Sequence, residues 1–178
     1  MAIYFATSNK HKFEEATNIL APEIEIKHFY FKHNEIRSDS VEEIALDALK
    51  HSKLKKPVFV EDTGLFIAAL NGFPGTFSAW VLAKIGSKGI LKLMKGKNRS
   101  AAFRTCIAFT NGKITKIFMG ECKGKIAYKQ RGTAGFGYDS IFIPQGYRKT
   151  FAEATKIKKK VSQRYKALMK LKKWITKK

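Results

Sequence analysis

The dipeptide Asn111-Gly112 separates two segments rich in β-branched and aromatic residues, 101–110 and 113–119. Asn-Gly is the strongest short signal for a β-hairpin, because both residues tolerate the positive φ angles of a tight turn. The second half of the chain is therefore predicted to contain a long antiparallel strand pair. Two more strands are expected further along, at 125–128 and 140–143, with a glycine-rich loop between them at 132–137.

The first half of the chain follows a different pattern, in which short apolar runs precede helical segments. Ile3 to Ala6 suits a buried strand, and Thr7-Ser8-Asn9 directly after it can cap a helix. Val58 to Val60 is a second buried run. Helices are expected after Asn9, after the capping box at Ser40, at 78–84, at 88–95 and from about Val161. Parallel-looking strands beside an antiparallel hairpin predict an α/β fold with a mixed sheet.

The chain has 178 residues and a formal net charge of +21. This length suits one domain, 1–178, with a substantial core, which we expect to form two lobes. The segment from Lys156 to Lys178 holds ten lysines and Arg164 but no acidic residue. Such a charge favours polyanionic partners, whether a nucleoside triphosphate or a nucleic acid, and is equally compatible with a solvated lysine-rich surface.

Membrane and secretory classes are not favoured. No apolar run approaches the roughly 20 residues of a membrane span, and the first residues lack the basic flank of a signal peptide. Cys106 and Cys122 are too far apart for a CxxC site. We expect a cytoplasmic protein with reduced thiols.

The first candidate site is the segment from Thr7 to Glu15. A helix beginning after Asn9 offers free N–H groups and the positive end of its dipole, which suit a phosphate. Lys12 lies in the first turn and can reach the same anion, while Glu15 on the same face could hold Lys12 in place. An ordinary capped surface helix is the alternative.

The second candidate is Glu61-Asp62-Thr63-Gly64, which we expect at the end of the buried strand. Two adjacent carboxylates are costly to leave unpaired near a core. Mg²⁺ commonly takes one or two protein carboxylates together with water and phosphate oxygens. A simple strand end with an Asp-Thr-Gly turn is the alternative.

Two further groups lie in the second half of the chain. Phe136-Gly137-Tyr138-Asp139 could stack on a base while its glycine allows close backbone approach. Lys158, Ser162, Gln163 and Arg164 could project basic and amide groups toward one site. The alternatives are a core aromatic pair and an exposed lysine-rich helix. The order of the glycines in 132–137 does not match a dinucleotide-binding fingerprint, and the four histidines lack metal-ligand spacing.

Together these segments resemble the inosine triphosphate pyrophosphatase family, also described as Ham1-like or non-standard purine NTP pyrophosphatases. The likeness runs from Ile3 to about Leu171. Its pieces, in the family's order, are TSNKHKFEE, VEDTGL, NGFPGTFSAW, FRTCIAF, FGYDSIF and GYRKTFAEA followed by KKKVSQRYKAL.

The resemblance implies a two-lobed α/β fold with a long, twisted mixed sheet, flanking helices and a nucleotide cleft between the lobes. It implies a homodimer that hydrolyses ITP, dITP and XTP to the monophosphate and pyrophosphate, which keeps these nucleotides out of nucleic acid.

The resemblance also implies residue roles and a Mg²⁺ cofactor. The triphosphate would be held by Thr7, Ser8, Asn9 and Lys12. Asp62 and Glu35 would bind Mg²⁺, and Asp62 and Lys12 would act in catalysis. The nucleotide would be contacted by Thr63, Phe136, Gly137, Tyr138, Asp139, Lys158, Gln163 and Arg164.

The chain departs from the family pattern at three positions. Gln163 stands where the family usually has histidine, Ala48 where it often has lysine, and Ser140 where proline is usual. Gln163 keeps a hydrogen-bond donor and an acceptor but cannot carry positive charge. A related pyrophosphatase with altered base choice is therefore an alternative.

From a different functional class, a basic nucleic-acid-binding module acting through the lysine-rich C-terminal tail is a second alternative. The chain has no RNP-type, zinc-binding or helix-turn-helix pattern in its support. A scaffold without chemistry would leave the clustered carboxylates unexplained.

Overall fold

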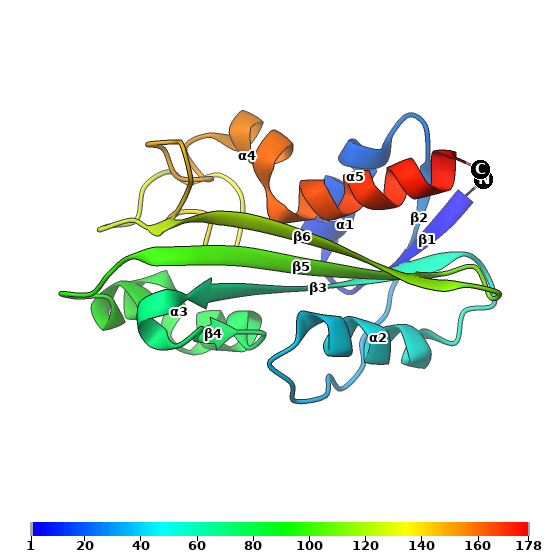
Figure 1. The fold of residues 1–178 in the computed structure, drawn as a ribbon, viewed down its shortest axis with the longest axis horizontal. Helices are drawn as coiled ribbons and strands as arrows, with labels where there is room; N and C mark the ends of the chain where they lie inside the picture. Colours follow the sequence, from blue (N-terminus) through cyan, green and yellow to red (C-terminus); the bar gives the residue numbers. More distant parts are fainter. Residues whose placement is uncertain (1, 178) are drawn as a thin grey trace. The chain divides into compact units, whose positions relative to one another are not determined.

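The computed structural model describes residues 2–177 (Figure 1). Its strands are β1 (Ala2–Ala6), β2 (Glu25–Phe29), β3 (Val58–Ile67), β4 (Pro74–Gly75), β5 (Ser100–Thr110), β6 (Thr115–Ile126) and β7 (Phe142–Pro144). Its helices are α1 (Lys10–Leu20), α2 (Val41–Ser52), the short 3₁₀ turn η1 (Ala68–Leu70), α3 (Ser78–Leu93), α4 (Thr155–Val161) and α5 (Gln163–Thr176).

The strands form one seven-stranded mixed sheet with the order β2-β1-β3-β5-β6-β7, and β4 pairs with β3 beside this path. β1 is parallel to both β2 and β3, with Tyr4 opposite Val58 and Phe5 opposite Phe59. The β3–β4 and β6–β7 pairs are antiparallel. The α/β class and the mixed sheet expected from the sequence are confirmed.

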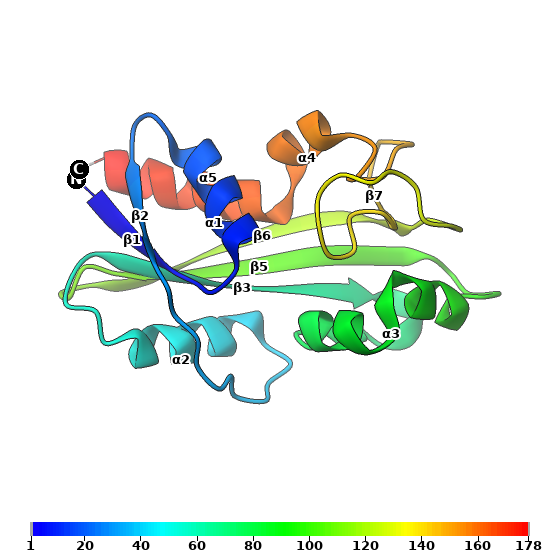
Figure 2. The ribbon, with the colours of Figure 1, turned by 180° about the vertical axis from the view of Figure 1, so that it is seen from behind.

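The chain divides into two compact units. Unit 1 comprises 1–62, 105–120 and 164–178, and unit 2 comprises 63–104 and 121–163. The strands β3, β5 and β6 contribute residues to both. The core of unit 1 packs α1 and α5 against strand residues that include Phe5, Phe59 and Phe109. In both views α2 lies on the other side of these strands from α1 and α5 (Figures 1 and 2).

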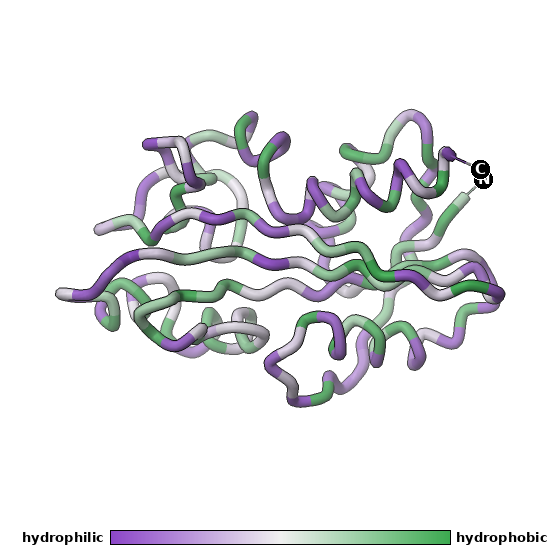
Figure 3. The backbone as a smooth tube through the Cα atoms, in the orientation of Figure 1, coloured by the Kyte–Doolittle hydropathy of each residue, from purple (hydrophilic) through white to green (hydrophobic). Residues whose placement is uncertain are grey.

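Unit 2 has its own core, in which Val81, Ile90 and Met94 of α3 pack against Leu65 and Phe142 of the strands. The tube coloured by hydropathy shows the alternation that builds both cores, with hydrophobic and hydrophilic turns following each other along α5 (Figure 3). None of the helices between residues 2 and 177 combines the length and the apolar character that crossing a membrane requires.

The local helix signals are confirmed. Asn9 caps α1, since its side chain accepts a hydrogen bond from the backbone N–H of Lys12, and Ser40 caps α2 by accepting from the N–H of Glu43. The two helices expected at 78–84 and 88–95 are the two parts of α3, which kinks at Gly86, where φ is 63°.

Four strand and helix boundaries differ from expectation. β3 does not end before Glu61 but continues to Ile67, because it pairs with β4 after β1 has ended. The strands expected at 113–119 and 125–128 are one strand, β6, because Cys122 is buried between the half-buried Glu121 and the exposed Lys123 and the alternation continues through it. The strand expected at 140–143 is shortened to β7, since Ile141 closes a turn onto the Tyr138 carbonyl.

The helix expected from about Val161 is α5, which begins at Gln163 because Ser162 adopts an extended conformation. The preceding helix α4, which ends at Val161, was not expected. Nor were β2, β4 and η1, which are short elements held by their neighbours.

Tyr138 provides a pH test of the unit 2 core. Its hydroxyl donates to the Ser78 carbonyl at 3.0 Å, and burial raises the pKa of the phenol from 10.0 to about 12. The folded state therefore holds the phenolic proton more tightly than the unfolded chain does. The resulting stability is present below pH 10 and is lost as the pH rises toward 12.

We expect Tyr138→Phe to lower the free energy of unfolding by about 1 kcal/mol at pH 7, through the lost hydrogen bond. Raising the pH to 11 should then cost the wild type about 1 kcal/mol more than the variant. Urea unfolding of both proteins at the two pH values measures this difference. An identical alkaline loss in both proteins would contradict the assignment.

Candidate active site

The turn between β1 and α1 is closed by its own polar side chains. The backbone N–H of Asn9 donates to Thr7 Oγ1 at 3.1 Å, and Asn9 Oδ1 accepts from the N–H of Lys12 at 3.1 Å. His28 Nε2 is hydrogen-bonded to the Thr7 carbonyl at 2.8 Å, which ties the turn to β2. Ser8 is exposed at the tip. The turn is thus a fixed helix N-terminus of the kind that binds anions.

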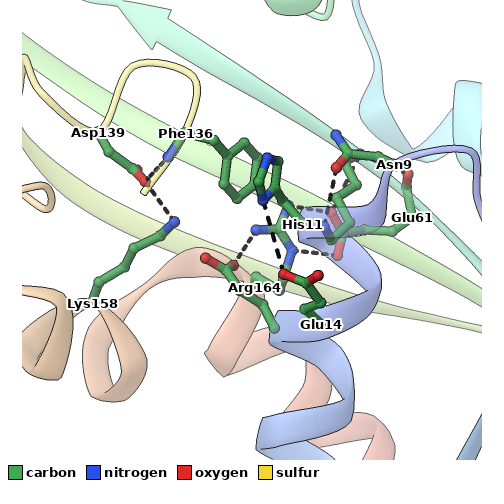
Figure 4. A network of polar contacts seen from close by, with 10 residues as sticks. Asn9, His11, Glu14, Glu61, Phe136, Asp139, Lys158 and Arg164 are labelled. Atoms are coloured by element: carbon green, nitrogen blue, oxygen red, sulfur yellow. Dashed lines mark hydrogen bonds and ion pairs between the residues drawn. The ribbon is translucent and has the colours of Figure 1, made fainter. Parts of the chain in front are cut away.

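A buried ion network lies behind this turn (Figure 4). Arg164 donates through Nε and Nη2 to the two carboxylate oxygens of Glu61, both at 2.8 Å, and through Nη1 to Glu15. Lys12 Nζ donates to the Glu61 carbonyl at 3.2 Å and lies 3.4 Å from Glu61 Oε1. The Glu61 side chain is 0% exposed and that of Arg164 is 2% exposed. The two cations therefore balance the two carboxylates, with Glu61 and Arg164 shielded from water and Lys12 and Glu15 half-buried.

This network keeps Arg164 charged. Burial on its own would lower the pKa of the guanidinium, but the charges and hydrogen bonds of Glu61 and Glu15 outweigh burial and raise the pKa above its ordinary value. A paired charge of this kind costs several kcal/mol to desolvate and is tolerable only with near-complete hydrogen bonding. The fork of Arg164 provides that bonding because guanidinium and carboxylate match in a bidentate pair.

Asp62 lies on the opposite face of β3 from Glu61, since successive side chains of a strand alternate. It is 8% exposed. In β5, Ile107 and Phe109 face the core with α1 and α5, so Cys106 faces the α2 side. Burial, together with the charges of Glu42, Asp62 and Glu61, raises the pKa of the Cys106 thiol to about 12. The surroundings of this thiol, which include Asp62, are therefore negative.

Metal binding was tested against the donors present in unit 1. Glu61 is committed to Arg164 and Lys12, which leaves Asp62 as the carboxylate of β3 suited to a cation. Glu35 is exposed in the loop that leads into α2. Within residues 2–177, no three His, Cys, Asp or Glu side chains form a group that could hold a metal by themselves. This donor set fits Mg²⁺, which keeps water and phosphate oxygens among its ligands, and does not fit an all-protein metal cage.

Unit 2 contains a second polar cluster, around Asp139. Its carboxylate accepts from the backbone N–H of Phe136 at 2.9 Å and from Lys158 Nζ at 2.7 Å. The Lys158 ammonium also lies 4.5 Å from the centre of the Phe136 ring. Gly135 is required here, because its φ is positive and a Cβ would overlap Asp139 Oδ2. The loop therefore presents an aromatic ring backed by a buried, paired cation.

The other predicted nucleotide contacts of unit 2 differ in what they offer. The Tyr138 ring is buried and its hydroxyl donates to the Ser78 carbonyl, so a ligand would contact the backbone of Tyr138 and not its side chain. Gly137 has a φ of 67° and Thr63 is half-buried in β3. Gln163 is 4% exposed, and its carbonyl oxygen Oε1 has no hydrogen-bond partner within the described part of the chain. A buried amide in this state is suited to accept from a ligand.

One contact differs from the sequence expectation. Glu15 does not hold Lys12, because it pairs with Arg164, and Lys12 pairs with Glu61 instead. Arg164 pairs with the carboxylates of Glu61 and Glu15, and Lys158 pairs with Asp139. The role of His28 was missed, and nothing in its sequence context indicated that it bonds the Thr7 carbonyl.

A groove of about 670 Å³ in unit 2 is lined by residues such as Phe66, Arg104, Lys123 and Tyr147. None of the predicted site residues lines it.

We expect Arg164→Met to destabilise the fold by about 3–5 kcal/mol, because it leaves the buried Glu61 and the half-buried Glu15 without this counter-ion. Arg164→Lys keeps the charge but loses the bidentate geometry. Its free energy of unfolding should therefore lie between those of Arg164→Met and the wild type. Urea unfolding at pH 7 measures the free energies. A loss below about 0.5 kcal/mol for Arg164→Met, as for an exposed surface residue, would show that the network is not structural.

Comparisons with known proteins agree with this geometry. The family model described as "Ham1 family" matches residues 3–174. A protein named dITP/XTP pyrophosphatase from Methanopyrus kandleri is 47% identical over 180 residues, covering 98% of this chain and 96% of its own. Its namesake from Thermococcus kodakarensis is 43% identical over 180 residues, covering 98% and 97%.

Solved structures give the same result. A HAM1 protein from Coxiella burnetii superposes with a TM-score of 0.86 at 30% identity, covering 100% of both chains. The Ham1 protein of Staphylococcus aureus has a TM-score of 0.83 at 27% identity and covers 98% of both chains. The matched model spans the β1–α1 turn, the β3 carboxylates and the Asp139 cluster, and on this evidence the chain belongs to the Ham1 family.

Proposed function

We propose that this chain is a Mg²⁺-dependent nucleoside-triphosphate pyrophosphatase that converts ITP, dITP and XTP to the monophosphate and pyrophosphate. The observation that carries the proposal is that the two adjacent carboxylates of β3, Glu61 and Asp62, have different surroundings. Glu61 is neutralised by Arg164 and Lys12, while the adjacent Asp62 lies on the opposite face of β3 and is 8% exposed. The names of the relatives, dITP/XTP pyrophosphatase, support the substrate class.

The reaction needs charge neutralisation and a positioned water more than a covalent nucleophile. A water oxygen bonds to the α-phosphorus, and the bond from this phosphorus to the α–β bridging oxygen breaks. Asp62 would accept the water's proton. Lys12 and the first N–H groups of α1 offset the charge that develops on the leaving pyrophosphate, with Thr7, Ser8 and Asn9 shaping the turn.

Asp62 and Glu35 are the residues that we propose for the metal. Mg²⁺ bound there would neutralise phosphate charge and increase the acidity of the attacking water. The exposed position of Glu35 suits a ligand that is completed by the substrate's own phosphate oxygens.

The Asp139 cluster is proposed to bind the base and sugar. Phe136 offers a ring for stacking, and Lys158 behind it is held by Asp139. Gln163 offers the unpartnered Oε1 and an amide N–H₂. A 6-oxopurine presents an N1–H donor beside an O6 acceptor, which complements an amide, whereas adenine presents an acceptor at N1.

The proposal treats 1–178 as a single catalytic domain made of both units, and a homodimer remains an expectation that sedimentation can test. A related pyrophosphatase that does not select non-standard bases is the alternative, motivated by Gln163 in place of histidine.

We expect pyrophosphate release from ITP, dITP and XTP to be fast in the presence of Mg²⁺, slow from ATP and GTP, and abolished by chelation. Asp62→Asn should lower kcat by about 10²–10⁴-fold, because the proton acceptor and a metal ligand are lost. Asp39→Asn, an exposed carboxylate of the same unit, is the matched control and should keep full activity. Equal rates on all five triphosphates would contradict the selectivity, and full activity of Asp62→Asn would contradict the site.

We expect Gln163→Leu to lower kcat/KM for ITP by about 10-fold or more, because a buried polar contact is lost, while the rate for ATP changes little. The ITP/ATP ratio of kcat/KM is the measurement. Gln163→His tests the alternative, since an increase in the ITP/GTP ratio over the wild type would mean that the glutamine has relaxed base choice. An unchanged ITP/ATP ratio in Gln163→Leu would exclude a contact between this residue and the base.

A further inference from the structure

The acidic and basic residues of the chain are unevenly distributed. Eleven of the fourteen acidic residues lie between Met1 and Asp62. The two other segments of unit 1, 105–120 and 164–178, contain no acidic residue, but hold eight lysines and Arg164. These two segments form the outer part of β5, β6 and α5. The charged side chains of these two segments of unit 1 are therefore all basic.

The lysines of α5 follow one face of the helix. Lys166, Lys170 and Lys173 lie on the helix and Lys177 on the turn after it, at spacings of four, three and four residues. All four are exposed, whereas Leu168 and Leu171 on the other face are fully buried. At about 1.5 Å rise per residue the row spans roughly 16 Å. Lys172, at the side of the row, is paired with Glu23 at 2.8 Å and is not part of it.

Contacts to β6 extend this row into a surface. Lys170 Nζ donates to the Met119 carbonyl at 2.8 Å, and the Lys116 ammonium lies 5.5 Å from the centre of a Trp174 ring. Lys113 is exposed in the hairpin turn before β6. We call the resulting surface the basic face, made of Lys113, Lys116, Lys166, Lys170, Lys173 and Lys177.

The composition of the basic face does not match a stabilising ion-pair surface. Thermostable proteins gain from networks in which both charge signs alternate, whereas the two segments that carry this face contain no acidic residue. Like charges closer than the Debye length of about 8 Å repel one another. A polyanion removes that repulsion, and duplex DNA supplies one charge per about 1.7 Å of its axis.

We infer that the basic face binds the sugar–phosphate backbone of nucleic acid without reading its sequence. The row of about 16 Å is long enough to meet several consecutive phosphates of one strand. The face offers flexible ammonium groups, which fix position on phosphates but do not distinguish bases. The inference is independent of the proposed pyrophosphatase reaction, since none of these lysines belongs to the proposed site.

The test is the salt dependence of binding to 20-base-pair DNA duplexes of two unrelated sequences, followed by fluorescence anisotropy. Each phosphate contact contributes about −0.9 to the slope of log K against log salt. The variant Lys166→Gln/Lys170→Gln/Lys173→Gln/Lys177→Gln should lose roughly 3 to 4 from the magnitude of that slope. Both duplexes should bind equally, and pyrophosphate release from ITP should equal that of the wild type.

Two controls make the result specific. Lys32→Gln/Lys50→Gln/Lys53→Gln/Lys55→Gln changes the net charge equally at exposed lysines of the acid-rich segment, and its slope should change by less than about 1. Replacing the four α5 lysines by arginine keeps the charge and should keep the slope, which excludes misfolding as the cause of a loss.

Equal slopes for the wild type and the α5 glutamine variant would overturn the inference, as would equal losses in both glutamine variants. So would a strong preference for one duplex sequence. A second lysine row comprises Lys88 and Lys92 on α3 and Lys95 in the turn after it. If substituting only that row removes the salt dependence, the basic face of α5 is not the binding surface.

Discussion

Three segments of unit 1 that are distant in the sequence meet at the Arg164 guanidinium. Glu61 comes from β3, Glu15 from α1, and Arg164 itself from the start of α5. Arg164 is the largest fully buried side chain in the described chain. Because a buried charge without its partners is far more costly than a lost hydrophobic contact, these three elements can assemble only in an arrangement that completes all the bonds of the fork. The hydrophobic core provides most of the driving force, and this network selects the register.

The positions of the other site residues in unit 1 follow from that selection. With α1 held by Glu15, its first turn places Lys12 against Glu61, and the Asn9 cap holds the N–H groups of the turn in place. With Glu61 facing α1 and α5, strand alternation turns Asp62 to the α2 side. The cluster of unit 2 repeats the same principle on a smaller scale, because a buried Asp139–Lys158 pair fixes the loop that carries Phe136.

The parts of the structure that were predictable from sequence are those decided by neighbours in the chain. Asn9 and Ser40 cap helices by bonding residues three positions ahead, and the Asn111-Gly112 hairpin is equally local. The partners of Lys12 and Glu15 were not predictable, since the choice between Glu15 and Glu61 depends on an arginine more than a hundred residues away. β2 and β4 were missed for the same reason, because short strands depend on the strands beside them. Family resemblance alone supplied Glu35, which no local pattern singles out.

The two counter-ions of Glu61 are bound with different geometry, Arg164 more closely and Lys12 less closely. Arg164 holds both carboxylate oxygens at 2.8 Å, while the contacts of Lys12 to the same residue are longer, at 3.2 Å and 3.4 Å. If Lys12 leaves for another anion, Glu61 still keeps two charge-assisted hydrogen bonds and is not stranded in the core. Without a ligand, Lys12 is thus held in place by Glu61, whose own charge is already balanced by Arg164. Moving the Lys12 ammonium to an arriving phosphate therefore requires little reorganisation of the surrounding protein.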